Sequence, residues 1–177
     1  MLSIFSLLIV AIMLTFCLHC FYSYFYPMKY KEEIEMLGQE YDVKSALIAS
    51  VVNSESGFNE SAQSSKGACG IMQIMPTTAE WVALKIGKEY SQEKLFDVKY
   101  NLEIGTYYLS YLIKYFNDEK LAICAYNAGQ GNVSNWLKNE EYSSDGKSLF
   151  KIPFKETEDY LNKVYKNYNY YLRKYKS

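Results

Sequence analysis

The first 28 residues, MLSIFSLLIVAIMLTFCLHCFYSYFYPM, contain no Asp, Glu, Lys or Arg, and every formal charge lies from Lys29 onward. A helix needs roughly 20 apolar residues to cross a bilayer, and this stretch supplies them. A cleaved signal peptide has a basic start and small residues at its cleavage site. This segment has no basic residue at its start, and it ends in aromatic residues. We therefore predict an uncleaved transmembrane anchor over 1–28, with an interfacial belt of aromatic residues at its end.

The remaining chain divides into a juxtamembrane connector over 29–40 and one domain over 41–177, because no linker interrupts the later sequence. Lys29 and Lys31 follow the anchor and would slightly favour a cytoplasmic domain. Long domains, however, translocate largely regardless of flanking charge. The orientation therefore stays open on charge alone.

Composition excludes several classes of protein. Nineteen Lys and Arg against twenty Asp and Glu give a net charge of −1, which argues against a nucleic-acid partner. The only histidine, His19, lies in the anchor, so the domain has no Ser-His-Asp or Cys-His machinery and no His-rich zinc site. It holds only two cysteines, Cys69 and Cys124, and no Walker-type phosphate loop. We expect neither a metal nor a cofactor.

The pattern from residue 29 is mainly helical. A short helix is expected to end near Gly38, and Asp42 is expected to cap a second helix that ends at Gly57. The segment 67–75, GACGIMQIM, is short, apolar and flanked by Gly, which favours a strand or hairpin. The sequence predicts an α+β fold, predominantly α-helical, with a small β-hairpin region.

Four further helix signals follow the hairpin segment. Thr77 and Glu80 fit a capping box, which gives Glu80 a structural role, and Asp97 and Asp118 fit N-caps. The helix that Asp118 begins is expected to end at Gly129. From Lys155 onward, Tyr, Leu and Val at three-four spacing predict a final amphipathic helix.

The position of Glu55, at the end of an apolar run, is unusual for a carboxylate. It falls on one helical stripe with Ile48, Val51 and Val52, so it prolongs the apolar face. Desolvation and the negative end of the helix dipole would both raise its pKa, as a general acid requires. The alternative is a solvated glutamate on a frayed last turn.

Several stretches resemble the soluble-lytic-transglycosylase domain of the lysozyme superfamily. ESGFNESAQSSKGACGIMQIMPTTA is similar to its Glu-Ser start, Gly-Ala-x-Gly turn and Met-Gln-x-Met-Pro-x-Thr-Ala segment. NLEIGTYYLSYL, AYNAG and ETEDYLNKV resemble three later motifs in the right order, and together the four motifs span about 40–166. Cys69 and Cys124 stand where the family has small residues, and Val98 where proline is common. The resemblance implies a lysozyme-like fold.

The resemblance also implies an activity, the cleavage of the β-1,4 bond between N-acetylmuramic acid and N-acetylglucosamine in peptidoglycan. Ordinary glycosidases use two carboxylates. Here Glu55 alone would protonate the leaving oxygen and then accept the proton of the muramoyl C6 hydroxyl as that oxygen closes on C1. Because this nucleophile belongs to the substrate, proximity replaces a second carboxylate. The product would be a 1,6-anhydromuramoyl end.

The matched positions imply a substrate-binding set beside the catalytic Glu55. Its members are Ser64, Gln73, Met75, Tyr126, Asn127 and Glu156. The implied partners are peptidoglycan glycan strands and, through the N-terminal helix, the membrane. The implied location is a single-pass membrane protein whose domain lies outside the cytoplasm.

Two other functions stay open. A muramidase would hydrolyse the same bond with water, and a catalytically silent protein would only bind peptidoglycan. Two states of the thiols also stay open. Cys69 and Cys124 could form a disulfide, which that compartment permits, or remain two buried thiols.

Overall fold

The computed structural model describes residues 4–175, and these form eight α-helices and one short 3-10 helix. Residues 1–3 of the predicted anchor and 176–177 of the predicted domain lie outside the described residues. The elements are α1 (Ile4–Phe25), α2 (Lys31–Tyr41), α3 (Ser45–Glu55), α4 (Pro76–Ile86), η1 (Glu93–Phe96), α5 (Val98–Phe116), α6 (Glu119–Ala128), α7 (Gln130–Leu137) and α8 (Lys155–Tyr171).

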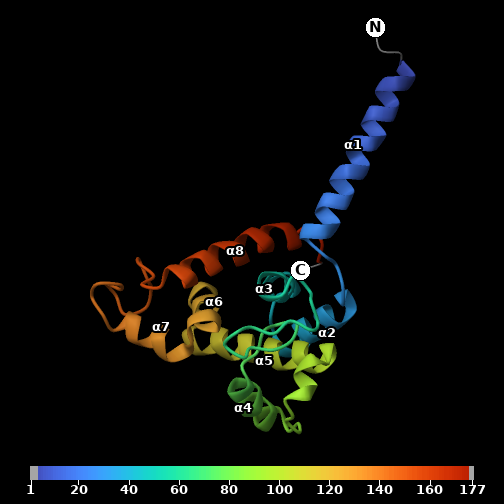
Figure 1. The fold of residues 1–177 in the computed structure, drawn as a ribbon. Helices are drawn as coiled ribbons and strands as arrows, with labels where there is room; N and C mark the ends of the chain where they lie inside the picture. Colours follow the sequence, from blue (N-terminus) through green and yellow to red (C-terminus); the bar gives the residue numbers. More distant parts are fainter. Residues whose placement is uncertain (1–3, 176–177) are drawn as a thin grey trace.

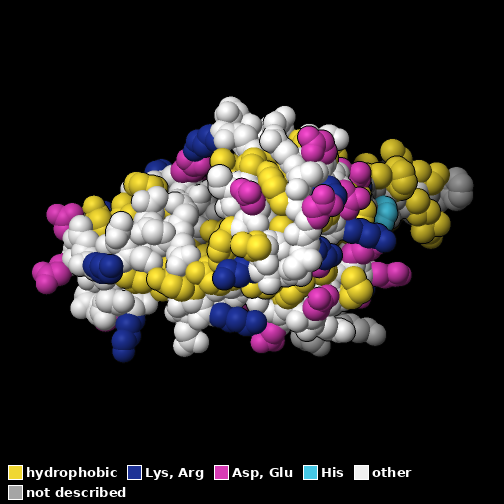
Figure 2. Space-filling model, turned by 90° about the horizontal axis from the view of Figure 1, so that it is seen from below, with side chains coloured by type: hydrophobic (Ala, Val, Ile, Leu, Met, Phe, Trp, Pro, Cys, Tyr) yellow, Lys and Arg dark blue, Asp and Glu magenta, His cyan; other side chains and the backbone are white. Residues whose placement is uncertain are grey.

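Helix α1 projects away from the rest of the molecule (Figure 1). Residues Ser6–Phe25 are long and apolar enough to cross a membrane, and none of that segment is buried inside the protein. Figure 2 shows hydrophobic side chains covering the projecting helix, whereas charged side chains of both signs are scattered over the domain. A helix that is apolar all round and unburied in its own protein fits a lipid environment.

The core is built around α3, which is apolar on nearly every side. Its residues 46–52 are all buried, as expected for a helix surrounded by others. Helix α8 packs along α3 and α6, while α5 packs against α6, α2 and α4. In Figure 1, α3 and α6 therefore lie between α8 and α5. This arrangement brings the C-terminal ends of α3 and α6 close to the start of α8.

Two predicted helix boundaries, the end of α2 and the cap of α3, were wrong. Helix α2 continues past Gly38 to Tyr41, and Asp42 ends it in the left-handed conformation (φ 57°). Asp42 therefore closes α2 instead of capping α3, which begins after Lys44 without a side-chain cap. The chain turns here because the backbone N–H of Val43 donates to the carbonyl of Gly38, a typical helix C-terminal closure.

Two predicted caps are confirmed. The side chain of Asp97 accepts a hydrogen bond from the backbone N–H of Tyr100 at 2.9 Å, and that of Asp118 accepts one from Leu121 at 2.7 Å. The capping box at Thr77 and Glu80 was wrong. Helix α4 begins at Pro76, because proline at the first helical position already has a helical φ and lacks the N–H that a cap would satisfy.

The expected hairpin at 67–75 is not formed by strands in the described part of the chain. Two isolated antiparallel bridges occur instead, one between Gln63 and Cys69 and one between Cys69 and Ile74. Turns separate the paired residues, and Gln73 adopts a positive φ of 50°. The segment is therefore a compact folded loop. Cys69 and Cys124 are buried and are not bonded to each other.

Candidate active site

Glu55 is the last residue of α3, and it faces the first turns of α8. Its Oε1 accepts a hydrogen bond of 2.7 Å from the phenol of Tyr160. The next residue, Ser56, donates its hydroxyl to the carbonyl of Ile71 at 2.7 Å, which fixes the end of α3 against the folded loop. Glu55 is therefore held by the protein on both sides of the helix end, and it is not a solvated residue on a frayed turn.

The surroundings of Glu55 raise its pKa from 4.5 to about 7. Burial is the main cause, because it disfavours the charged carboxylate. The Tyr160 hydrogen bond and the positive charge of Lys163 act in the opposite direction and limit the rise. Lys163 itself donates to the backbone carbonyl of Ser54 at 2.6 Å, near the negative end of the α3 dipole. A carboxyl with this pKa can both give and accept a proton near neutral pH.

Two tyrosines lie near the carboxyl, Tyr160, which is buried, and Tyr126, which is partly buried. Burial raises the pKa of Tyr126 and Tyr160 well above the usual value, and the negative charge of Glu55 raises both further. Both phenols therefore stay protonated and act as hydrogen-bond donors. Tyr160 donates to Glu55, while Tyr126 donates to the backbone carbonyl of Met72 at 3.0 Å.

The folded loop that faces this site is fastened to α5 by Asn101. The Asn101 amide donates to the carbonyls of Cys69 (3.0 Å) and Leu95 (2.8 Å), and its oxygen accepts from the N–H of Met72 (2.8 Å). A side chain at Gly70 would come within 2.1 Å of the Leu95 carbonyl, and one at Gly105 within 2.4 Å of the Met72 sulfur. The Asn-x-x-x-Gly motif therefore lets α5 approach the loop closely.

Two adjoining pockets, of about 260 and 320 Å³, form a groove beside this loop. They share Thr78 and Tyr108. The first is lined by Gln73, Ile74, Met75, Thr78, Tyr108, Tyr126, Asn127, Ala128 and Gly129. The second is lined by Thr77, Thr78, Trp81, Tyr108, Tyr111 and Gln130. Aromatic side chains can pack against the faces of a ring-shaped ligand, and the amides and hydroxyls beside them can hydrogen-bond to its hydroxyl groups.

Four of the six residues expected to bind substrate line the first pocket. Gln73 is held there by its amide, which donates to the carbonyls of Gly70 (2.8 Å) and Ala62 (3.0 Å). Asn127 accepts a hydrogen bond of 2.7 Å from the Thr157 hydroxyl. Met75 is 41% exposed, so it is not a core residue. Tyr126 completes the set, and it is near enough to Glu55 for the carboxylate charge to raise the pKa of its phenol.

The other two expected residues lie outside the groove lining. The Ser64 hydroxyl accepts from the N–H of Ala68 at 2.9 Å, which closes a turn in the folded loop. Glu156 is exposed in the first turn of α8 and pairs with Lys66 at 3.6 Å. The structure thus brings the loop and the start of α8 together through this ion pair, but neither side chain contacts the groove.

Tyr160 is the main residue that sequence reasoning missed. It lies in the quoted ETEDYLNKV motif, yet only Glu156 of that motif was expected at the site. Thr157, which orients Asn127, was missed in the same way. Both residues point inward from α8, since Thr157 and Tyr160 are buried at three-residue spacing while Glu156 is exposed. Helical spacing within the motif was the available signal.

The described residues 4–175 contain no group of three or more His, Cys, Asp or Glu side chains that could hold a metal ion. Glu55 lines neither pocket of the groove; the groups that can do chemistry around it are its carboxyl, with a pKa of about 7, the phenols of Tyr126 and Tyr160, and the amides of Gln73 and Asn127 in the groove lining.

A family model described as the transglycosylase SLT domain matches residues 32–150. The chain belongs to this family. The match confirms the family expected from the four motifs.

Related proteins and structures agree with the family match. The soluble lytic murein transglycosylase of Escherichia coli K12 is 32% identical over 143 residues, covering 78% of this chain and 22% of that protein. The membrane-bound lytic murein transglycosylase C of Pectobacterium atrosepticum is 28% identical over 159 residues, covering 77% and 44%. The aligned part of this chain thus covers about a fifth of the length of the first relative and less than half of the length of the second.

A solved structure shares the fold. It is the lytic transglycosylase Slt of Pseudomonas aeruginosa, crystallised as an inactive mutant with glutamine in place of a glutamate. It superposes with a TM-score of 0.75 at 32% identity, covering 84% of this chain and 25% of that one. The predominantly helical fold predicted from the sequence is confirmed.

Proposed function

We propose that this SLT protein is a membrane-anchored lytic transglycosylase that cleaves the MurNAc-β-1,4-GlcNAc bond of peptidoglycan without water. The observation that carries the proposal is the state of Glu55. Its carboxyl is largely buried, has a pKa of about 7 and receives a hydrogen bond from Tyr160. The residues that shift its pKa include no second carboxylate.

In the proposed reaction, protonated Glu55 gives its proton to the glycosidic oxygen as the bond to C1 breaks. The resulting carboxylate is stabilised by the Tyr160 phenol and the nearby positive charge of Lys163. It then accepts the proton of the muramoyl C6 hydroxyl as that oxygen bonds to C1. Protons balance, because Glu55 ends in the form in which it began.

Gln73, Met75, Tyr126 and Asn127 are proposed to hold the sugars in the groove, since all four line its first pocket. Ser64 and Glu156 are proposed to act at its margin, where the Lys66–Glu156 ion pair joins the folded loop to α8. The Pseudomonas aeruginosa transglycosylase supports the central role of a glutamate, since its variant with glutamine at a glutamate position is inactive.

The proposed location follows from the substrate. Peptidoglycan lies outside the cytoplasmic membrane, so α1 is proposed to cross the membrane once and to leave the domain outside. The membrane-bound relative from Pectobacterium atrosepticum is consistent with membrane association. We also propose that the domain begins at α2 and not at residue 41, because Ile34 and Leu37 are buried in the same core as α3.

Mass spectrometry of digested peptidoglycan tests the proposal. Purified full-length protein in detergent should release muropeptides with 1,6-anhydromuramoyl ends. Products heavier by one water would identify a muramidase, and no release with retained binding would identify a silent peptidoglycan-binding protein. Either result would overturn the proposal.

A further inference from the structure

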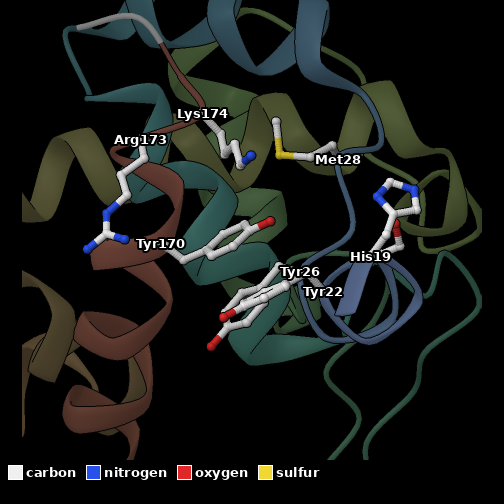
Figure 3. Close-up of a pocket in the computed structure, with 8 residues that line it drawn as sticks. His19, Tyr22, Tyr26, Met28, Tyr170, Arg173 and Lys174 are labelled. Carbon is white, nitrogen blue, oxygen red and sulfur yellow. The ribbon is translucent and has the colours of Figure 1, made fainter. Parts of the chain in front are cut away.

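The end of the anchor helix is seated against α8. The ring of Tyr26 stacks on Tyr170 with centroids 4.0 Å apart, and Tyr22 stacks on the same ring at 5.7 Å. The Tyr171 phenol donates to the Pro27 carbonyl at 2.9 Å, and Asn53 donates to the Phe25 carbonyl at 3.0 Å. Figure 3 shows the three stacked tyrosines between the two elements. The domain is therefore docked on its anchor and not loosely tethered.

A pocket of about 610 Å³ lies at this junction (Figure 3), within the usual size range of small-ligand sites. One wall is a single face of the last turns of α1, continued by the next residue, because His19, Tyr22, Ser23 and Tyr26 follow helical spacing. The other wall comes from Met28, from Tyr170 in the last turn of α8, and from two residues that lie beyond the end of that helix. The complete lining is His19, Tyr22, Ser23, Tyr26, Met28, Tyr170, Arg173 and Lys174.

The charge of the lining is one-sided. None of its eight residues is acidic, whereas Arg173 and Lys174 are both cationic. Arg173 is the only arginine in the sequence, and His19 is the only histidine. Among the ion pairs of residues 4–175, none involves Arg173 or Lys174. The Lys174 ammonium lies 5.7 Å from the centre of the Tyr170 ring. Two cations that are neighbours in the sequence and have no carboxylate partner among residues 4–175 favour an anionic ligand.

The position of the pocket along α1 identifies the kind of anion. Tyr22 and Tyr26 lie at the end of the apolar segment Ser6–Phe25, where aromatic residues sit at the level of lipid headgroups. Lipid phosphates lie at this same level. Arginine binds phosphate through two parallel hydrogen bonds, and lysine adds a point charge. The phenols and the Ser23 hydroxyl can bond to a polar headgroup beyond the phosphate.

We propose that the α1–α8 pocket binds the headgroup of an anionic phospholipid, with Arg173 and Lys174 holding its phosphate. The bound lipid would fix how the domain stands on the membrane surface. This inference rests on the proposed membrane anchoring through α1, but it does not depend on the chemistry at Glu55. The binding site is separate from the groove, because the two share no lining residue.

The test is a titration of full-length protein in neutral detergent with dioctanoyl phosphatidylglycerol, followed by native mass spectrometry. Dioctanoyl phosphatidylcholine and inorganic phosphate are the comparison ligands. The test variant is Arg173→Gln/Lys174→Gln. The matched control is Lys138→Gln/Lys147→Gln, which removes the same charge in the segment that follows α7, far from α1 in Figure 1. All four side chains lie outside the groove lining.

Phosphatidylglycerol should bind the wild type and the control equally, and the test variant about 30-fold more weakly, at about five-fold per cation removed. Phosphatidylcholine should bind more weakly than phosphatidylglycerol. Equal binding by the test variant, or an equal loss in the control, would overturn the site. Competition by inorganic phosphate at equal concentration would show a free-phosphate site and overturn the lipid assignment. Release of soluble muropeptides should be unchanged in the test variant, so a failure of the proposed catalysis is recognised separately.

Discussion

The phenol of Tyr160 donates a hydrogen bond of 2.7 Å to the carboxyl of Glu55, which lies 105 residues earlier in the chain. This contact joins the end of α3 to the second turn of α8 and holds the carboxyl in one orientation. It also stabilises the carboxylate and so limits the rise of the Glu55 pKa that burial causes. Position and proton affinity of the proposed catalytic group thus depend on the same bond.

Glu55→Gln should lower muropeptide release at least about a hundredfold, because the amide keeps the shape and can accept from Tyr160 but has no proton to donate. Glycan binding should persist. Glu60→Gln and Glu80→Gln are the controls, since both side chains are exposed, and they should cost little activity. A Glu55→Gln enzyme that kept more than a hundredth of the wild-type rate would rule out this residue as the acid.

Tyr160→Phe should shift the pH dependence of cleavage. Its phenol lowers the pKa of Glu55, so removing it should raise that pKa further above 7. The alkaline limb of the kcat/KM profile should then move to higher pH, with some loss of rate from the freed carboxyl. Tyr165→Phe, on the same helix and half-buried, is the matched control and should leave the limb in place. An unshifted limb in Tyr160→Phe would mean that the bond does not tune Glu55.

Glu55 should also make the protein less stable at alkaline pH. Its folded pKa of about 7 lies above its ordinary value of 4.5. Folded protein therefore keeps the proton longer, and the associated stability is complete below pH 4.5 and lost as pH rises through 7. The loss amounts to about 3 kcal/mol, at about 1.4 kcal/mol per pH unit.

Glu55→Gln removes this titration. The variant should be more stable than wild type in urea at pH 8 and equally stable near pH 4.5. Equal stabilities at both pH values would contradict the raised pKa, whereas the activity of the variant would not bear on it.

Among the buried polar residues, Asn101 is the one whose replacement should lower the free energy of unfolding most. Its side chain makes three hydrogen bonds to backbone groups of the folded loop and of η1. At about 1 kcal/mol per bond, Asn101→Ala should lower the free energy of unfolding by about 3 kcal/mol, and it should loosen the loop that carries Gln73. Ser110→Ala, on the same helix, loses one bond to the Tyr41 carbonyl and should cost about 1 kcal/mol. Similar losses of unfolding free energy in the two variants would mean that the three Asn101 bonds do not hold the loop in this way.

Local sequence signals predicted the parts of the fold that local forces decide. Asp97 and Asp118 cap their helices because a cap bonds to a backbone N–H three residues away. The stripe containing Glu55 predicted its burial because helical periodicity alone sets that face. The length of the apolar N-terminal segment likewise predicted a helix there.

Local signals could not predict contacts between segments that are far apart in the sequence. The bond from Tyr160 to Glu55 depends on how α8 lies across α3, and no local pattern encodes that placement. The sequence of the 67–75 loop predicted a hairpin because its residues suit strands, but Asn101 of α5 hydrogen-bonds to two of its backbone groups instead. Asp42 was misread because aspartate suits both a helix start and the left-handed end of the preceding helix.

The proposed topology predicts that the domain is accessible from outside the cell. The segment between α7 and α8 carries Lys147 and Lys151, both exposed, so trypsin added to intact protoplasts should cut there. Early cleavage should slow in Lys147→Gln/Lys151→Gln, while a cytoplasmic marker protein stays intact. Lysed protoplasts provide the reference for complete digestion. Protection of the domain in intact protoplasts, together with digestion after lysis, would mean that it faces inward, and a peptidoglycan substrate would then be out of its reach.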